Sequence, residues 1–181
     1  FDKLFNYKIV HSGGRYLNNI GLRGGVKDKL EFQKKHKFVI AFENTSHKGY
    51  CTEKIVQAFA AGAIPIYWGD TSISNIFNEK AFINCHEYSS FDDVVSAVRE
   101  IDEDHEKYIS MLREPALIDE NIRESEFLKF KSFLYHIFDQ DYIDAFRRDY
   151  VGYGKMHCDE LKKGYHIRKI PVLRSIYNRL Y

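Results

Sequence analysis

The sequence has few cysteines, no long apolar run and almost no net charge. Its 181 residues include three cysteines, Cys51, Cys85 and Cys158, with no Cys-x-x-Cys pair and no companion histidines at zinc-ligand spacing. This usage argues against a disulfide framework and a zinc site, and it predicts reduced thiols in a cytoplasmic protein. No apolar run approaches the roughly 18 residues that cross a bilayer, and no signal peptide is visible. A net charge of +1 gives no indication of nucleic-acid binding.

The first half of the chain alternates between strand-like and helix-like patterns. KFVIAFE (37–43) and AIPIYWG (63–69) are short, nearly continuous apolar runs, which are typical of buried parallel strands. Between them, TEKIVQAFAAG (52–62) has apolar residues at helical spacing, with Thr52 as a candidate N-cap and Gly62 as a candidate stop. Strand, helix and strand in this order predict a right-handed βαβ unit with parallel strands.

Further elements follow along the chain. We expect a third strand at 80–85 and helices at 90–101, 104–113 and 120–138, the first of them capped by Ser90. Strands that alternate with helices predict an α/β fold of Rossmann type, with a parallel sheet flanked by helices.

The last part of the chain, residues 141–181, is predicted to be a helical basic tail. From Leu161 to Tyr181 the sequence has six lysines and arginines and no acidic residue, interspersed with apolar side chains. Two interpretations stay open. The apolar side chains pack on their own domain, or the tail makes peripheral contact with an anionic membrane at the inner membrane face. Because the first residue is Phe1 and not methionine, we expect a piece of a longer protein.

The predicted first strand runs into a polar loop before the predicted helix, within FENTSHKGYCTEK (42–54). In open α/β sheets, ligands bind beyond the carboxyl ends of the strands, where this loop lies. Lys54 is unusual there, because a cation in the first turn of a helix opposes the positive end of the helix dipole. A diphosphate docked at the helix N-terminus would give Lys54 a partner. The alternative is an ordinary surface helix in which Lys54 is solvated.

Neighbouring side chains suit a nucleoside diphosphate that carries a sugar. Glu53 can accept hydrogen bonds from two ribose hydroxyls, and Thr52 can donate to a phosphate. Asn44 offers donors and acceptors, and Tyr50 adds a hydroxyl and an aromatic face. We therefore expect these residues to bind substrate together with Lys54.

The block KFVIAFENTSHKGYCTEKIVQAFAAGAIPIYWG closely resembles the characteristic segment of the α-1,3-fucosyltransferases of bacterial type, glycosyltransferase family 10. Phe42-Glu43-Asn44 and Tyr50-Cys51-Thr52-Glu53-Lys54 fit the family pattern position by position. Cys51 occupies a variable position of that pattern, and we interpret it as a packing residue within the donor-binding block.

This resemblance implies the C-terminal half of a GT-B glycosyltransferase, in which two Rossmann-like domains face each other across a cleft. Residues 1–140 would be the GDP-fucose-binding domain, and the N-terminal acceptor domain would lie outside this chain. The implied reaction moves fucose from GDP-fucose to a hydroxyl of N-acetylglucosamine or glucose, with inversion. The acceptor would be an oligosaccharide or a glycolipid such as lipopolysaccharide.

The resemblance also assigns donor contacts to individual residues. Glu53 would bind ribose and Lys54 the diphosphate, with Asn44, Tyr50 and Thr52 as further contacts.

A second segment, VKDK, lies where bacterial members of the family also touch the donor. It comprises Val26, Lys27, Asp28 and Lys29. Asp28 could accept hydrogen bonds from the guanine edge, and the two lysines could add positive charge near the phosphates. The alternative is a solvated turn.

No metal or other cofactor is expected. No Asp-x-Asp pair stands beside the predicted crevice, so Lys54 and the helix N-terminus would stabilise the departing GDP as fixed positive charge. The general base that inversion requires would come from the N-terminal domain, and Glu43 is expected to support the loop instead. Two other functions stay open: a nucleotide-sugar binding module without transfer activity, and a GT-B transferase that uses another nucleotide sugar.

Overall fold

The structure is a computed structural model, and it describes residues 1–14, 17–22, 24–141 and 152–170. The chain divides into two compact units, Phe1–Ile122 and Arg123–Tyr181, which are described separately. The functional boundary predicted at residue 140 stays a prediction, because compactness alone does not define which residues bind a ligand.

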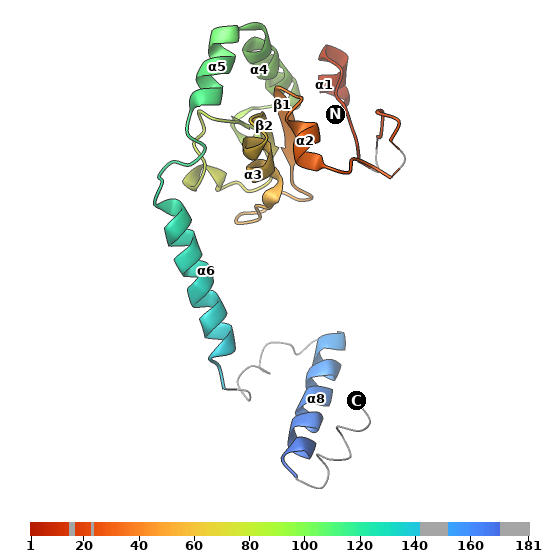
Figure 1. Ribbon diagram of the computed structural model, residues 1–181, viewed down its shortest axis with the longest axis vertical. Helices are drawn as coiled ribbons and strands as arrows, with labels where there is room; N and C mark the ends of the chain where they lie inside the picture. The colour runs from red at the N-terminus through yellow and green to blue at the C-terminus, as the bar shows by residue number, and fades with distance from the viewer. Residues whose placement is uncertain (15–16, 23, 142–151, 171–181) are drawn as a thin grey trace. The chain divides into compact units, whose positions relative to one another are not determined.

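The first unit contains all the strands that the described residues form (Figure 1). In chain order its elements are α1 (Asp2–Tyr7), α2 (Lys29–Gln33), β1 (Phe38–Phe42), α3 (Glu53–Ala60), β2 (Ile64–Trp68), η1 (Ile73–Asn75), β3 (Ile83–Asn84), η2 (Cys85–Glu87), α4 (Phe91–Glu103) and α5 (His105–Arg113), where η denotes a 3₁₀ helix.

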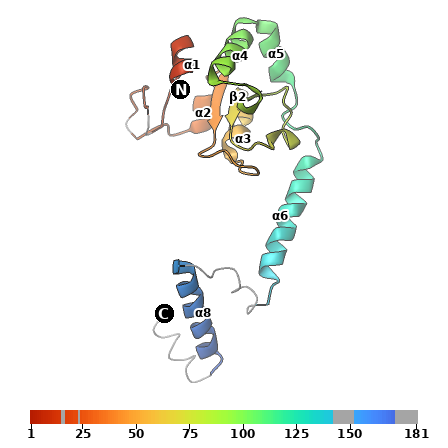
Figure 2. The same ribbon diagram turned by 180° about the vertical axis from the view of Figure 1, so that it is seen from behind.

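The three strands form one parallel sheet in the order β1–β2–β3. Phe38 pairs with Ile64 and Phe42 with Trp68, so the two longer strands are in register over their whole length. The predicted α/β fold, with a parallel sheet flanked by helices, is confirmed (Figures 1 and 2).

The third strand is shorter than the predicted range 80–85. The chain still turns at Ala81, whose N–H donates to Asn78 O at 2.9 Å. At the other end η2 begins at Cys85, and Asn84 accepts a hydrogen bond from the N–H of His86. Local hydrogen bonds at both ends therefore leave only two residues for the sheet.

Pro65 lies in the central strand although proline cannot donate a ladder hydrogen bond. The N–H of Ile64 points toward β1 and donates to Lys37 O at 2.9 Å. Because successive N–H groups along a strand point to opposite sides, the missing N–H of Pro65 faces the side of β3. Pairing with β3 begins only at Ile66, which lies opposite Ile83. The proline therefore removes no hydrogen bond that the sheet needs.

Alternating side chains of β1 and β2 build a core on each face of the sheet. One face carries Tyr67, which is completely buried in a cluster with Ile55 of α3. The other carries Ile66, in a cluster with Val94 and Val98 of α4. Burial on both faces explains the continuous apolar runs. Because both faces of the sheet are buried, polar side chains can cluster only at the ends of the strands.

The predicted helix ends agree closely with the structure. Ser90 caps α4 by accepting a hydrogen bond from the N–H of Asp93 at 3.3 Å. After α3, Gly62 has a φ of +68°, a left-handed conformation that suits glycine, and its N–H donates to Phe59 O. The two shortest α-helices of the first unit, α1 and α2, contain too few residues for a helical pattern to be recognised.

The second unit contains most of α6 (Ile122–Phe138), which matches the helix predicted at 120–138, and α8 (Gly152–Arg168). The predicted basic tail, 141–181, falls partly on α8 and partly on 142–151 and 171–181, which lie outside the described residues. Within the described ranges, no helix is both long enough and apolar enough to cross a membrane. Peripheral membrane contact through the tail stays a prediction.

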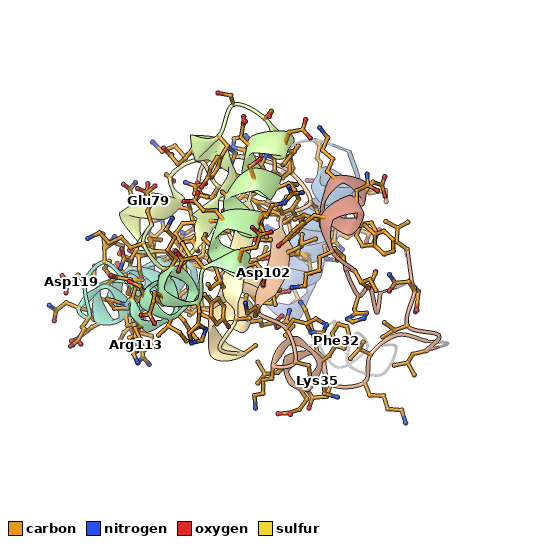
Figure 3. The ribbon with its side chains drawn as sticks, turned by 90° about the horizontal axis from the view of Figure 1, so that it is seen from above. Phe32, Lys35, Glu79, Asp102, Arg113 and Asp119 are labelled. Carbon is orange, nitrogen blue, oxygen red and sulfur yellow. The ribbon has the colours of Figure 1, made fainter. Side chains whose placement is uncertain are left out.

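Asp102 lies near the end of α4 (Figure 3). It connects three elements of the first unit. Its carboxylate accepts hydrogen bonds from Lys8 at 2.6 Å, Lys37 at 2.9 Å and the hydroxyl of Tyr7 at 3.0 Å. Only 5% of the side chain is exposed. Burial would raise the pKa of Asp102, but the three donors lower it to about 2. The network holds α1, the start of β1 and α4 together.

We expect Asp102→Asn to lower the free energy of unfolding at pH 7 by about 1–2 kcal/mol, because the amide loses the charge that the two lysines balance. The native pKa of Asp102 lies below its ordinary value of 3.8. The carboxylate therefore stabilises the native state above about pH 4, and this contribution is lost as the pH falls toward about 2. Urea unfolding across this pH range measures the difference between wild type and variant, which should shrink in acid.

Asp92→Asn is the control for this experiment. The Asp92 side chain is 72% exposed where it pairs with Lys3 in the first turn of α4, so its replacement should lower stability less than Asp102→Asn does. A stability difference for Asp102→Asn that stays constant from neutral to acidic pH would contradict the role of the ionised carboxylate.

Candidate functional site

The loop between β1 and α3 is held to the end of β2 by hydrogen bonds. Ser46 Oγ donates to Gly69 O at 2.8 Å, and the N–H of Gly49 donates to Asp70 Oδ1 at 2.8 Å. Asp70 is buried and also accepts from the N–H and the hydroxyl of Ser72, at 2.8 and 2.7 Å. Burial would raise the pKa of Asp70, but these donors hold it below its ordinary value. The loop is therefore firmly attached to the carboxyl edge of the sheet.

Glu43, directly after β1, lies at the centre of this edge. Its side chain is completely buried. One carboxylate oxygen accepts from the N–H of Thr52 at 2.8 Å, and the Thr52 hydroxyl lies 3.0 and 2.7 Å from the two oxygens. The Lys54 ammonium lies 3.3 Å away. Burial would raise the pKa of Glu43, but the donors of Thr52 and Lys54 lower it, so the group stays ionised.

Thr52 is the N-cap residue of α3, as predicted, but its side chain makes no capping hydrogen bond. The prediction of a capping hydroxyl is wrong because Glu43 engages that hydroxyl instead. A hydroxyl has one hydrogen to donate. A bond from Thr52 to a phosphate, which stays a prediction, would therefore require the bond to Glu43 to open.

Lys54 reaches back from the first turn of α3 to the end of β1. Its Nζ donates to Phe42 O at 2.8 Å and to Asn44 Oδ1 at 3.1 Å, in addition to the ion pair with Glu43. The side chain is 26% exposed. The alternative of a solvated surface lysine is therefore wrong. Three oxygen partners offset the unfavourable position of the cation at the start of a helix.

The outer side of this arrangement offers groups that a ligand can reach. Asn44, Tyr50 and Glu53 have exposed side chains. The backbone N–H groups of Glu53 and Lys54 donate to none of the described residues. Amides at a helix start favour an anion, so this helix start can accept a phosphate beside the lysine.

Cys51 faces the interior of the first unit. It is partly buried and packs against the core cluster that contains Tyr67. Burial raises the pKa of its thiol, so the sulfur stays protonated at neutral pH. This geometry supports its interpretation as a packing residue and gives it no role as a nucleophile.

The VKDK segment, residues 26–29, forms the entry to α2. The N–H of Val26 donates to Gly13 O at 3.2 Å, and Asp28 caps α2 by accepting from the N–H of Glu31 at 3.0 Å. Both lysines of the segment are exposed. α2 packs beside α3, but no hydrogen bond or ion pair between described residues joins the segment to the β1–α3 loop. Its predicted ligand contacts stay predictions.

Sequence reasoning did not identify Gly69 and Asp70, which follow β2. A Cβ atom added at Gly69 would lie 2.8 Å from Glu43 Cβ and 2.8 Å from the Tyr67 hydroxyl. Glycine is needed here because the Glu43 side chain fills the space. The signal was available, since the carboxyl ends of both parallel strands meet at the same edge of the sheet.

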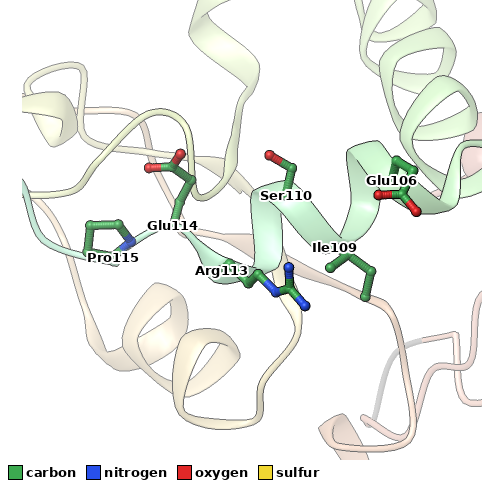
Figure 4. Close-up of a pocket in the computed structure, with 6 residues that line it drawn as sticks. All are labelled: Glu106, Ile109, Ser110, Arg113, Glu114 and Pro115. Carbon is green, nitrogen blue, oxygen red and sulfur yellow. The ribbon is translucent and has the colours of Figure 1, made fainter.

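A hollow on the protein surface lies away from these residues, along α5 (Figure 4). None of the predicted site residues lines it. Its lining residues are Glu106, Ile109, Ser110, Arg113, Glu114 and Pro115. In the part of the chain that the structure describes, no three His, Cys, Asp or Glu side chains come together as metal ligands.

Comparison with known proteins identifies the family. The family model for glycosyltransferase family 10 (fucosyltransferase), C-terminal part, matches residues 2–114, more than half of the chain. The chain belongs to glycosyltransferase family 10. The resemblance seen in the sequence is thereby confirmed.

Curated relatives of the family cover part of this chain. The Alpha-(1,3)-fucosyltransferase FucT of Helicobacter pylori is 38% identical over 117 residues, which cover 65% of this chain and 24% of the relative. The human 4-galactosyl-N-acetylglucosaminide 3-alpha-L-fucosyltransferase 9 is 34% identical over 76 residues, which cover 41% of this chain and 21% of the relative. The chain thus spans about a quarter of the length of these curated relatives.

A solved structure of the family shows the same fold. The crystal structure of an alpha1,3-fucosyltransferase with GDP-fucose matches with a TM-score of 0.61 and 38% identity, over 63% of this chain and 33% of that chain. This likeness confirms the predicted Rossmann-like half of a GT-B glycosyltransferase.

We expect Gly69→Ala to lower the free energy of unfolding by about 1–3 kcal/mol, because the new methyl group would collide with Glu43 and Tyr67. Chemical denaturation measures this loss. In a Glu43→Ala background the same substitution should be less destabilising, because the nearest colliding atom, Glu43 Cγ, is gone. Equal losses in both backgrounds would show that Glu43 does not fill the space beside Gly69.

Proposed function

We propose that the first unit of this chain binds GDP-fucose and serves as the donor-binding part of an inverting α-1,3-fucosyltransferase. The observation that carries the proposal is the likeness, at 38% identity, to an alpha1,3-fucosyltransferase crystallised with GDP-fucose. The same fold has also been crystallised with GDP. Because the chain covers a third of that protein, transfer is proposed for a protein that combines this unit with an acceptor domain.

The helix start and the lysine beside it supply the groups that a diphosphate needs. The free amides of Glu53 and Lys54 can donate to phosphate oxygens, and the Lys54 ammonium lies beside them on the same turn. The Glu53 carboxylate is exposed and can accept hydrogen bonds from ribose hydroxyls. Exposed Asn44 and Tyr50 on the same loop supply further polar contacts, and residues 26–29 would meet guanine and the phosphates.

Fixed positive charge is the proposed catalytic contribution of this unit. As the bond between fucose and GDP breaks, negative charge grows on the diphosphate, and Lys54 with the helix amides would stabilise it without a metal ion. The general base that deprotonates the acceptor hydroxyl is assigned to the acceptor domain. The proposed acceptor is a hydroxyl of N-acetylglucosamine or glucose in an oligosaccharide or glycolipid, and the basic tail would bring the protein to the membrane that carries such glycolipids.

Calorimetric titration of the chain with GDP-fucose, GDP and UDP tests donor binding. The two guanine nucleotides should bind, and UDP should bind more weakly. Stronger binding of UDP would favour another nucleotide sugar, and no binding of any of the three would overturn the proposal. Release of GDP on addition of an acceptor, measured with a protein that includes the acceptor domain, separates a transferase from a binding module.

Lys54→Ala should weaken the binding of GDP by about 1.5–3 kcal/mol, the range for hydrogen bonds to charged groups. Guanosine, which lacks phosphates, should bind equally well to both proteins. Lys107→Ala is a matched control, because Lys107 pairs with Glu100 far from the loop, on α5 and α4. Undiminished GDP affinity in Lys54→Ala would refute the diphosphate role.

Glu53→Ala should weaken the binding of GDP and of guanosine by similar factors, because both ligands carry the ribose that Glu53 is proposed to bind. Competition titrations against GDP-fucose measure both affinities. If only GDP lost affinity, the ribose assignment would be wrong. If GDP bound more tightly, Glu53 would be acting mainly by repelling the phosphates.

A further inference from the structure

We infer that Glu43 is a positioning residue for donor binding: its buried carboxylate fixes the Lys54 ammonium and the opening of α3 in the arrangement that receives the diphosphate. This inference rests on the proposed function and adds a residue that would not touch the donor itself. Glu43 is completely buried, and it bonds to both Thr52 and Lys54.

A carboxylate at this place needs an explanation, because its charge would repel a diphosphate. A site selected only for positive charge would carry a neutral residue at position 43. The observed bonds show what the carboxylate provides instead. It joins the end of β1 to the first turn of α3, two elements that are separated by the ten residues 43–52.

The first group that Glu43 fixes is the lysine. An ammonium has three N–H donors, and Lys54 has three oxygen partners in Phe42, Asn44 and Glu43. A phosphate oxygen would replace the exposed partner, Asn44, while Phe42 and buried Glu43 keep the ammonium in place. A long, flexible side chain is thereby held in one conformation before the ligand arrives. Preorganisation of this kind strengthens binding, because less conformational freedom is lost when the ligand binds.

The second group is the helix opening. Glu43 accepts from both the N–H and the hydroxyl of Thr52, the N-cap residue, so it sets the angle at which the chain enters α3. The amides of Glu53 and Lys54 follow directly and stay available. The bare backbone of Gly69 leaves the room that the carboxylate needs. The Glu43 side chain packs closely against Gly69 and bonds to Thr52 and Lys54, so it has a fixed orientation.

Glu43→Gln separates three interpretations because it removes the charge and keeps the size. If charge alone mattered, GDP would bind more tightly to the variant. If Glu43 only stabilised the fold, the melting temperature would fall and GDP affinity would not change. If Glu43 positions the lysine and the helix opening, GDP affinity should fall by about tenfold, while guanosine affinity should fall less, because guanosine has no phosphates for Lys54 and the amides to bind.

The experiment is a calorimetric titration of wild type and variants with GDP and guanosine, with melting temperatures measured in parallel. Glu43→Asp, which keeps the carboxylate, should recover part of the GDP affinity. Gly69→Ala keeps the charge but displaces the side chain, so it should also weaken GDP binding, and it serves as the second variant if Glu43→Gln does not fold. Asp102→Asn is the control, a buried lysine-paired carboxylate elsewhere in the unit, and should lower stability without changing GDP affinity.

The outcomes distinguish this inference from the proposed function. A wild-type chain that binds no GDP overturns both. A wild-type chain that binds GDP, together with a folded Glu43→Gln variant of equal or higher GDP affinity, overturns the positioning role alone. If Glu43→Gln does not fold, unchanged GDP affinity in Gly69→Ala has the same meaning. Selective loss of GDP affinity with partial recovery in Glu43→Asp supports it.

Discussion

Glu43 carries a buried negative charge between the end of β1 and the first turn of α3, and the donors of Thr52 and Lys54 surround it. A buried carboxylate is strongly unfavourable unless such donors compensate it. The donors are equally dependent on it, because Lys54 stands at the positive end of a helix. The Glu43 carboxylate and the Lys54 ammonium thus each reduce the energetic cost of the other's position. The pair fixes where the helix begins, and with it the direction of the amides that face outward.

Asp70 performs the corresponding task at the end of the neighbouring strand. It holds Gly49 in the middle of the loop, while Glu43 holds Thr52 at the end of the loop. Two buried carboxylates at adjacent strand ends therefore shape a segment that would otherwise have many conformations. Both rely on the rigid sheet beneath them, whose two faces are filled by apolar side chains. The packed core thereby contributes to the site, because it supports the two strand ends that carry Glu43 and Asp70.

Much of this organisation could be predicted from the sequence. Continuous apolar runs identified β1 and β2, and the change to helical spacing at Thr52 located α3, because hydrophobic periodicity is a local property. The length of the third strand was overestimated, because a turn and a 3₁₀ helix form from the residues on either side of it. The capping role of Thr52 was wrong for a related reason. The Thr52 hydroxyl donates to Glu43, nine positions earlier in the chain. A hydrogen bond over that separation cannot be predicted from the local sequence pattern.

Pro65 has a consequence for the alignment of β3. If β3 slipped toward the amino end of β2, its carbonyl groups would meet a residue that has no hydrogen to offer. This shifted register would lack a hydrogen bond, so the observed register, with Ile66 opposite Ile83, is favoured over it. His86 follows β3, and its Nε2 lies 3.3 Å from Gly69 N and 3.2 Å from Gly69 O, so its contact with the end of β2 depends on that alignment. Pro65 in the central strand thus disfavours one incorrect register of β3, the strand at the edge of the sheet.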